Sequence, residues 1–264
     1  MGAHCWTRTG CRSGLAPAFL GRDTRLMDWQ DEGAILSMRP HGESAAIIEV
    51  LTAAHGRHAG VVRGGASRKM AAMLQPGSQV QVAWRARLQD HLGAFAVEPV
   101  RARAALMAER RALGALNAVC SLLRLCLPER EPHPVLYRAT IALLDELEAG
   151  ADWPARYLRW EVLLLEEVGF GLDLATCAVT GDTTDLAFVS PRTGRAVSRV
   201  AAGIWADRLM PLPACLMGQG PANAADLGLG LAITGHFLAR ELAPVLNDRP
   251  LPEARARLVE MLSR

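Results

Sequence analysis

The spacing of apolar residues changes once along this sequence, and that change limits the folds that the chain can adopt. Between residues 31 and 101, short apolar runs alternate with polar positions, whereas from about Ala104 the apolar residues recur every three or four positions. A period of two residues is typical of β-strands, and a period of 3.6 residues is typical of amphipathic α-helices. The sequence therefore predicts an α+β chain in which the β region precedes the helices.

The first region contains five β-prone runs separated by glycine-containing turns. The runs cover residues 32–39, 44–52, 59–65, 78–89 and 93–100. Five short strands with no helix-length pattern between most of them predict a small barrel or sandwich. We expect the apolar face of the fourth run, together with a phenylalanine of the fifth, to be core: Val80, Val82, Trp84, Ala86, Leu88 and Phe95.

The second region predicts helices that are interrupted by a hairpin-like segment. Helical patterns cover residues 113–127, 135–149, 154–168, 224–246 and 252–262. We therefore place a barrel at 27–103, a first helical part at 104–172, a hairpin at 173–201 and a second helical part at 202–264. We expect residues 1–26 to be a disordered extension or the product of an upstream start codon, with Met27 as the functional beginning. A targeting peptide is the alternative for this segment.

The distribution of charge favours a surface that binds a polyanion. The net charge is only +2, so a role with nucleic acid requires local clustering of charge. No acidic residue lies between Glu49 and Asp90. This interval contains the basic residues Arg57, Arg63, Arg68, Lys69, Arg85 and Arg87. Such a patch suits phosphates and shows no evident pattern for reading bases, and the alternative is a solvated basic face without a ligand.

The scarcity of aromatic residues indicates that any binding of nucleic acid is mainly electrostatic. Barrels that bind single strands often stack bases on exposed aromatic side chains. Here aromatic residues make up 5% of the chain, and we assign Trp84 and Phe95 to the core. We therefore expect weakly selective and strongly salt-sensitive binding.

The sequence lacks the usual signatures of catalysis, disulfides and membrane spans. It contains no GxSxG, GxxxxGK[ST] or HExxH motif and no GxGxxG that opens a helix. His55 and His58, three residues apart, are the one candidate metal pair outside the hairpin. The six cysteines form no CxxC pair, so we expect reduced thiols in a cytosol. No apolar run approaches the roughly 20 residues that span a bilayer.

The stretch CAVTGDTTDLAFVSPRTGRAVS, residues 177–198, has the layout of a small zinc ribbon without its ligands. A structural zinc site needs four nitrogen or sulfur ligands in a tetrahedron. The positions that such a ribbon would use hold Cys177, Thr180, Ser198 and Ala201, and no histidine lies between them. One thiolate cannot hold the metal, so we expect no zinc and a hairpin that remains as a remnant of the ribbon.

A series of motifs resembles the RecO family of bacterial recombination mediators. The motifs are RPHGE (39–43), HGRHAGVVRGG (55–65), LQPG (74–77), EPHPVLY (131–137), RYLRWEVLLLEEVGFGLDLATCAVTG (156–181) and SPRTGRAVS (190–198). The resemblance extends from residue 27 essentially to the C-terminus. It implies an α+β fold with an N-terminal five-stranded OB-fold barrel, followed by an α-helical domain with a zinc-ribbon-like insert. The insert is degenerate here, so the zinc of some relatives is not carried over.

The resemblance also implies a function and a set of partners. RecO-like proteins bind single- and double-stranded DNA and anneal complementary strands coated with single-strand-binding protein. With RecR they help to load RecA in gap repair, and they are not enzymes in the usual sense. We therefore expect a cytoplasmic, nucleoid-associated protein that needs no cofactor. We expect phosphate contacts from Arg57, Arg63, Arg68, Lys69, Arg85 and Arg87, with Arg39 at the edge, and protein partners on the helical domain.

Two other functions stay open at this point. A protein–protein scaffold could use the same basic barrel to bind the acidic tail of a partner, because a positive patch serves either role. An enzyme would require a pocket with converging titratable groups, which the sequence does not show.

Overall fold

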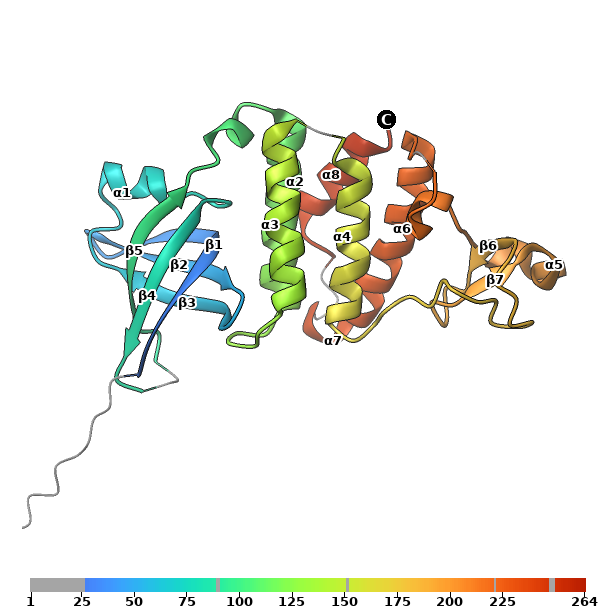
Figure 1. Cartoon of the computed structure of the whole chain (residues 1–264), viewed down its shortest axis with the longest axis horizontal. Helices are drawn as coiled ribbons and strands as arrows, with labels where there is room; N and C mark the ends of the chain where they lie inside the picture. The colour runs from blue at the N-terminus through green and yellow to red at the C-terminus, as the bar shows by residue number, and fades with distance from the viewer. Residues whose placement is uncertain (1–26, 89–90, 151, 221, 247–249) are drawn as a thin grey trace, which may run out of the picture.

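The computed structural model describes residues 27–264 apart from 89–90, 151, 221 and 247–249. The described chain forms three parts in a row: a β-barrel at one end, helices in the middle and a small sheet at the other end (Figure 1). This order confirms the predicted α+β fold. The expectation for residues 1–26 lies outside the described residues. None of the described helices is both long enough and apolar enough to cross a membrane.

Five strands close into the N-terminal barrel in the order β1-β2-β3-β5-β4. They are β1 (Met27–His41), β2 (Ala45–Thr52), β3 (Gly56–Val62), β4 (Gln79–Ala86) and β5 (Ala94–Arg101). Neighbouring strands are antiparallel except β3 and β5, which are parallel and pair at only two positions, Val61–Ala94 and Val62–Phe95. The five-stranded, OB-fold-like barrel is therefore confirmed. The short helix α1 (Arg68–Met73) joins β3 to β4 and was not predicted, because six residues complete fewer than two helical turns.

The barrel core follows the alternation of β4. The predicted apolar face is buried along the strand, together with the phenylalanine of β5: Val80, Val82, Trp84, Ala86 and Phe95. The prediction for Leu88 is wrong, since β4 ends at Ala86 and the Leu88 side chain is 60% exposed. The loop before β5 covers the indole of Trp84, whose Nε1 donates to the carbonyl of Leu92. A Cβ at Gly93, where φ is +68°, would lie 2.4 Å from that nitrogen, so the close approach requires glycine.

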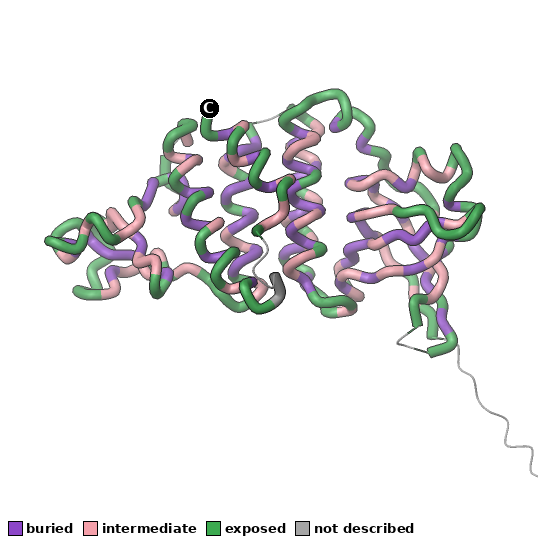
Figure 2. The backbone as a smooth tube through the Cα atoms, turned by 180° about the vertical axis from the view of Figure 1, so that it is seen from behind, coloured by how far each residue is buried: buried purple, intermediate pink, exposed green. Residues whose placement is uncertain are grey.

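The helices of the middle part pack around one apolar core. They are α2 (Arg110–Cys126), α3 (Pro134–Ala149), α4 (Pro154–Glu167), α6 (Ala224–Glu241), α7 (Ala243–Leu246) and α8 (Glu253–Leu262), preceded by the 3₁₀ helix η1 (Ala104–Met107). Helix α2 packs against α3 and α8, and α4 packs against α3 and α6. Figure 2 shows buried and exposed positions alternating along these helices, as amphipathic helices require. The helix predicted at 224–246 is divided into α6 and α7 at Leu242.

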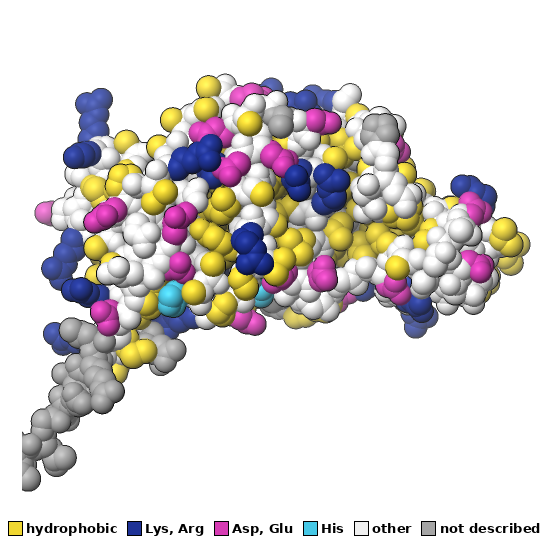
Figure 3. Space-filling model, viewed as in Figure 1, with side chains coloured by type: hydrophobic (Ala, Val, Ile, Leu, Met, Phe, Trp, Pro, Cys, Tyr) yellow, Lys and Arg dark blue, Asp and Glu magenta, His cyan; other side chains and the backbone are white. Residues whose placement is uncertain are grey.

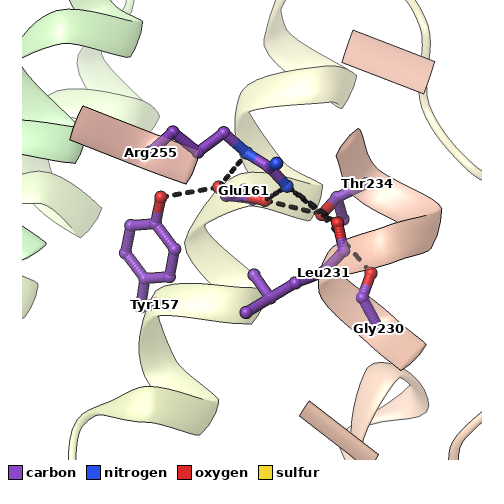
Figure 4. Close-up of polar contacts among 6 residues, drawn as sticks. All are labelled: Tyr157, Glu161, Gly230, Leu231, Thr234 and Arg255. Carbon is purple, nitrogen blue, oxygen red and sulfur yellow. Dashed lines mark hydrogen bonds and ion pairs between the residues drawn. The ribbon is translucent and has the colours of Figure 1, made fainter. Parts of the chain in front are cut away.

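A buried ion pair attaches the C-terminal helix α8 to α4 and α6 (Figure 4). Arg255 donates two hydrogen bonds of 2.8 Å to the carboxylate of Glu161, which is fully buried. The hydroxyl groups of Tyr157 and Thr234 donate to the same carboxylate at 2.6 Å each. Burial and the adjacent carboxylate raise the pKa of Tyr157 well above its usual value, so the phenol remains a donor. Because both oxygens of Glu161 are satisfied, the charge is tolerated in an apolar interior.

The insert forms the small sheet at the far end of the molecule. Its elements are β6 (Leu186–Val189), β7 (Ala196–Ser198), α5 (Arg199–Ala202), the 3₁₀ helix η2 (Gly203–Arg208) and β8 (Met210–Pro211), and the 3₁₀ helix η3 (Ala214–Met217) leads back to the helices. The predicted hairpin is present as β6 and β7. The sheet continues beyond the predicted limit at residue 201, because β8 pairs with the other side of β6. A two-residue strand is too short to show an alternating pattern.

Ion pairs connect one side of the barrel to the helices. Arg57 of β3 and Arg124 of α2 both contact the carboxylate of Glu49 at 2.8 Å. Burial raises the pKa of Glu49, but Arg124 and Arg57 lower it by more, so the net shift is downward and the carboxylate stays charged. The side chain of Arg103 is 1% exposed and lies within 3.4 Å of Glu148 on α3. We call this side of the barrel the junction.

Candidate nucleic-acid interface

Most of the basic residues predicted to contact phosphates lie on the barrel surface that faces away from the helices or at its edges. Six of them are exposed and have no ion-pair partner among the described residues: Arg39, Arg63, Arg68, Lys69, Arg85 and Arg87. In Figure 3, Lys and Arg side chains project from the outer side of the barrel. An exposed cation without an ion pair is available to a phosphate at little cost.

The fold brings some of these residues together and leaves others apart. Arg63 directly follows β3, and Arg85 lies on β4; both line one groove on the barrel. Arg68 and Lys69 form the first turn of α1, which contributes Met70 to the same groove. Arg87 lies beyond the end of β4, and Arg39 lies near the β1–β2 turn, opposite Ile47 of β2; neither of these two lines the groove.

The groove has a volume of about 720 Å³ and runs over the outer surface of β4 and β5. We call it the barrel groove, and its lining is Val62, Arg63, Met70, Ala83, Arg85, Ala94, Phe95, Ala96 and Val97. It exists because the side chains that point outward from these strands are small. Ala83 pairs with Ala96 across the two strands, and Arg85 pairs with Ala94. The brief contact between β3 and β5 leaves room beside this surface for Met70.

The acidic residues near the barrel groove do not neutralise its two arginines. Asp28 of β1 lies opposite Arg85 in the strand register, but no ion pair joins the two side chains. Glu98 lies two residues beyond Ala96 on β5 and is exposed, outside the groove lining. The charge of the described groove lining itself is therefore positive.

Arg57 does not fit the role predicted for it. Its guanidinium contacts Glu49, Glu129 and the carbonyl of Leu127, and its side chain is 14% exposed. These contacts place it at the junction, where carboxylates already satisfy its charge. The reason is that Glu49 lies just outside the acid-free interval in sequence and directly beside Arg57 in the fold. We therefore remove Arg57 from the proposed phosphate contacts.

The candidate metal pair lies at one end of the barrel within a group of aromatic rings. His55 stacks on Trp29 with ring centroids 4.0 Å apart, and its Nδ1 lies 3.3 Å from a carboxylate oxygen of Asp31. His58 is 4% exposed and contacts Trp84 edge to face at 4.6 Å. Neither ring nitrogen of His58 has a hydrogen-bond partner among the described residues. Burial and the positive charge of Arg130 lower the pKa of His58 to about 4, so the ring is neutral at pH 7.

The residues at the ribbon positions of the insert do not fit a structural zinc ion. Cys177 is 1% exposed, and its sulfur accepts a hydrogen bond from the backbone N–H of Ser198 at 3.3 Å. The hydroxyl of Ser198 accepts from the N–H of Ala201 and caps α5. Hydrogen bonds from Ser198 and then Thr180 lower the pKa of the Cys177 thiol to about 6. Hydroxyl groups and an alanine supply none of the three further nitrogen or sulfur ligands that zinc requires.

Some candidate functional residues were not predicted from the sequence. Alternation along β4 and β5 predicts the buried residues, and it carries no signal for the small outward residues Ala83, Ala94 and Ala96 that form the barrel groove. At the tip of the insert, Val200 and Ile204 are 86% and 89% exposed, and Trp205 is 54% exposed beneath the guanidinium of Arg208. These residues lie in α5 and η2, which have four and six residues, and helices this short show no apolar period in the sequence.

Two models of protein families match the chain, one in its N-terminal part and one in its C-terminal part. A family model described as "Recombination protein O N terminal" matches residues 27–103. A second, described as "Recombination protein O C terminal", matches residues 107–250. The first match covers the barrel, and the second covers the insert and most of the helices.

Individual relatives agree with the family models over nearly their whole length. The chain is 67% identical over 239 residues to the DNA repair protein RecO of Cereibacter sphaeroides, which covers 90% of this chain and 100% of the relative. It is 57% identical over 240 residues to the DNA repair protein RecO of Dinoroseobacter shibae, with coverage of 90% and 99%. It is 58% identical over 242 residues to that of a Jannaschia species, with coverage of 90% and 97%. The chain therefore belongs to the RecO family of DNA repair proteins.

Proposed function

We propose that this chain is a DNA-binding recombination mediator. It binds single- and double-stranded DNA and anneals complementary single strands. With RecR it helps to load RecA on DNA coated by single-strand-binding protein, in the cytoplasm at the nucleoid. Membership of the RecO family supports the partners. The observation that supports DNA binding by this chain is the barrel groove, where Arg63 and Arg85 are exposed and unpaired among the described residues.

Strand annealing follows from a broad cationic surface. Two single strands repel each other through their phosphates, and neutralising some of these charges lowers the repulsion without selecting a sequence. The exposed cations on the outer side of the barrel extend from the groove to the start of α1, where Arg68 and Lys69 lie. A surface of this kind holds two backbones close together and leaves the bases free to pair.

We propose that the chain does not act as an enzyme. A groove of about 740 Å³ lies between α4 and the insert, and Asp185 is the one titratable residue in its described lining. The carboxylate of Asp185 lies 3.4 Å from the guanidinium of Arg199. General acid–base or nucleophilic catalysis requires converging groups that this lining lacks.

We also propose that the protein binds no zinc. The support is the chemistry of the insert, in which one buried thiol is surrounded by hydroxyl and backbone groups. Packing of Cys177 with Val197 and Ala202 stabilises the insert in place of a metal.

The proposed DNA binding can be tested with a charge reversal on α1. Fluorescence anisotropy of a labelled single-stranded oligonucleotide would be measured with the full chain over a series of salt concentrations. With about four phosphate contacts, log Kobs should fall against log salt with a slope of about −3. The double variant Arg68→Glu, Lys69→Glu should bind more weakly and with a shallower slope.

A matched control separates a local effect from a change in net charge. Arg110 and Arg138 are exposed on α2 and α3 and have no ion-pair partner among the described residues. The variant Arg110→Glu, Arg138→Glu changes the net charge equally and should retain nearly normal binding. Equal affinity of wild type and the α1 variant at every salt concentration would contradict the proposal. Competition by an acidic peptide for the same cations would favour the scaffold alternative.

A further inference from the structure

We propose that the barrel groove binds an unstacked nucleobase of single-stranded DNA, so that this site prefers single strands to duplex. This inference rests on the proposed function, because it assumes that DNA reaches the outer side of the barrel. It differs from simple electrostatic binding, which neutralises phosphates of either form of DNA without contacting a base.

The shape of the groove suits a flat ring. Its floor consists of Ala83, Ala94 and Ala96, whose small side chains project from two paired strands. The partly buried side chains of Met70 and Val97, which pack against the barrel core, also line the groove. A volume of about 720 Å³ accommodates a nucleoside, since sites for small organic ligands span about 300–1,000 Å³. A flat apolar floor gives a base van der Waals contact over its whole face without selecting one base over another.

The groove also keeps its shape without a ligand. Phe95 lies beneath the floor and is 4% exposed, and its ring packs against the backbone of β3 at Gly60. A Cβ at Gly60 would lie 2.5 Å from that ring, so the aromatic side chain occupies the space that a larger residue would take. The floor therefore rests on a packed barrel core, so binding of a base requires little reorganisation of the protein and has a small free-energy cost from this source.

The charges around the groove favour a nucleotide over a neutral apolar ligand. Arg63 follows β3, Arg85 lies on β4, and both line the groove, so a base on the floor has a cation available for each flanking phosphate. Arginine suits this position because its planar guanidinium can bond a phosphate or stack on a base. Glu98 lies farther along β5 and repels phosphates. We therefore infer that the DNA backbone passes over the arginines and not along β5 toward Glu98.

Duplex DNA cannot use this site in the same way. A paired base lies inside the helical stack, and exposing it requires breaking its pair and its stacking. Duplex would therefore contact Arg63 and Arg85 through phosphates and leave the floor empty. Binding of single strands alone should depend on the empty space above the alanines.

The direct test fills the groove without changing its charge. The variant Ala96→Leu places a larger apolar side chain on the exposed floor. Loss of one base contact should weaken binding of a labelled dT oligonucleotide about tenfold. Affinity for a duplex of equal length should stay within twofold of wild type. The control Ala232→Leu, at an exposed position of α6, should affect neither ligand.

A second measurement needs no variant and so does not depend on how Ala96→Leu folds. Wild-type protein would be titrated with a dT oligonucleotide and with an abasic strand of the same length and charge. The inference predicts about tenfold weaker binding of the abasic strand, with the same salt slope. Equal affinity for the dT and abasic strands would overturn the inference. An equal loss of affinity for single strands and for duplex in Ala96→Leu would also overturn it. Either result would leave the proposed DNA binding intact. Absence of binding to every DNA would overturn both.

Discussion

The groove side and the junction side of the barrel both contain arginines, but in opposite surroundings. On the groove side, Arg63 and Arg85 are exposed and have no ion pair within the described chain. On the junction side, Arg57 and Arg103 are 14% and 1% exposed and contact carboxylates. A basic interval in a sequence therefore does not by itself identify a ligand surface. The carboxylates that the fold brings beside each arginine decide whether its charge is used internally or is available to a ligand.

The largest expected effect on stability comes from the barrel interior, which lies behind both sides and contains His58. The pKa of His58 is lowered to about 4 in the folded state, against about 6.5 in the unfolded state. As pH falls, the unfolded chain therefore takes up the proton first. The stabilisation is complete above about pH 6.5 and is lost progressively toward pH 4, by up to about 3 kcal/mol.

Urea unfolding followed by tryptophan fluorescence at several pH values would measure this loss. The variant His58→Leu should show a smaller decrease in the free energy of unfolding over the same range. The control His41→Gln, at an exposed residue, should behave like wild type. Identical pH dependence of wild type and His58→Leu would show that protonation of His58 does not couple to folding.

The next largest effect is a loss of stability when a charge is removed at the junction. Arg103→Met keeps most of the side-chain length but removes the charge that contacts Glu148 and Asp145. Because Arg101 still pairs with both carboxylates, we expect the free energy of unfolding to fall by about 2 kcal/mol, less than for a fully isolated buried charge. DNA affinity measured at a temperature where the variant is folded should stay unchanged. A large loss of DNA binding with normal stability would contradict the division into two sides.

A pair of equivalent substitutions compares the two sides directly. Arg63→Met should lower the affinity for DNA several-fold and leave the melting temperature within about 1 °C of wild type, since an exposed side chain without an ion pair adds little to stability. Arg57→Met should do the reverse and lower stability by about 1–2 kcal/mol. The same assays, anisotropy and urea unfolding, would be applied to both. Equal behaviour of the two variants would remove the basis of the comparison.

The last prediction concerns the insert, where we expect removal of metal to have no effect. Purified protein should contain no stoichiometric zinc by elemental analysis, and a chelator should change neither its melting temperature nor its affinity for DNA. The substitution Cys177→Ala should destabilise the insert through lost packing, independently of added zinc. One equivalent of zinc lost together with the Cys177 side chain would contradict this account of the insert.

The large elements of the fold were predictable from the sequence because each is long enough for its apolar period to repeat several times. Alternation along β4 and the three-to-four spacing of the helices determined the order of barrel and helices. Short elements were not predictable: α1 has six residues and β8 has two. The alternation wrongly predicts Leu88 in the core, because it continues in the sequence after β4 has ended.

The candidate site was predictable in composition but not in arrangement. The acid-free interval correctly marked exposed cations such as Arg63 and Arg85. The interval could not exclude Arg57, because the carboxylates that bind its guanidinium are brought to it by the fold. They are Glu49 on β2 and Glu129, which is 72 residues away in the sequence. The groove floor depends on register, since Ala83 and Ala96 become neighbours only when β4 pairs with β5.

The salt dependence of single-strand binding shows whether Arg63 and Arg85 contact phosphates. We would compare wild type with the double variant Arg63→Glu, Arg85→Glu, using the full chain and one labelled oligonucleotide from low to physiological salt. If the groove arginines contact phosphates, the slope of log Kobs against log salt should change from about −3 to about −1.5, since each lost contact removes about 0.7. An unchanged slope and affinity would contradict the account and place DNA binding elsewhere on the molecule.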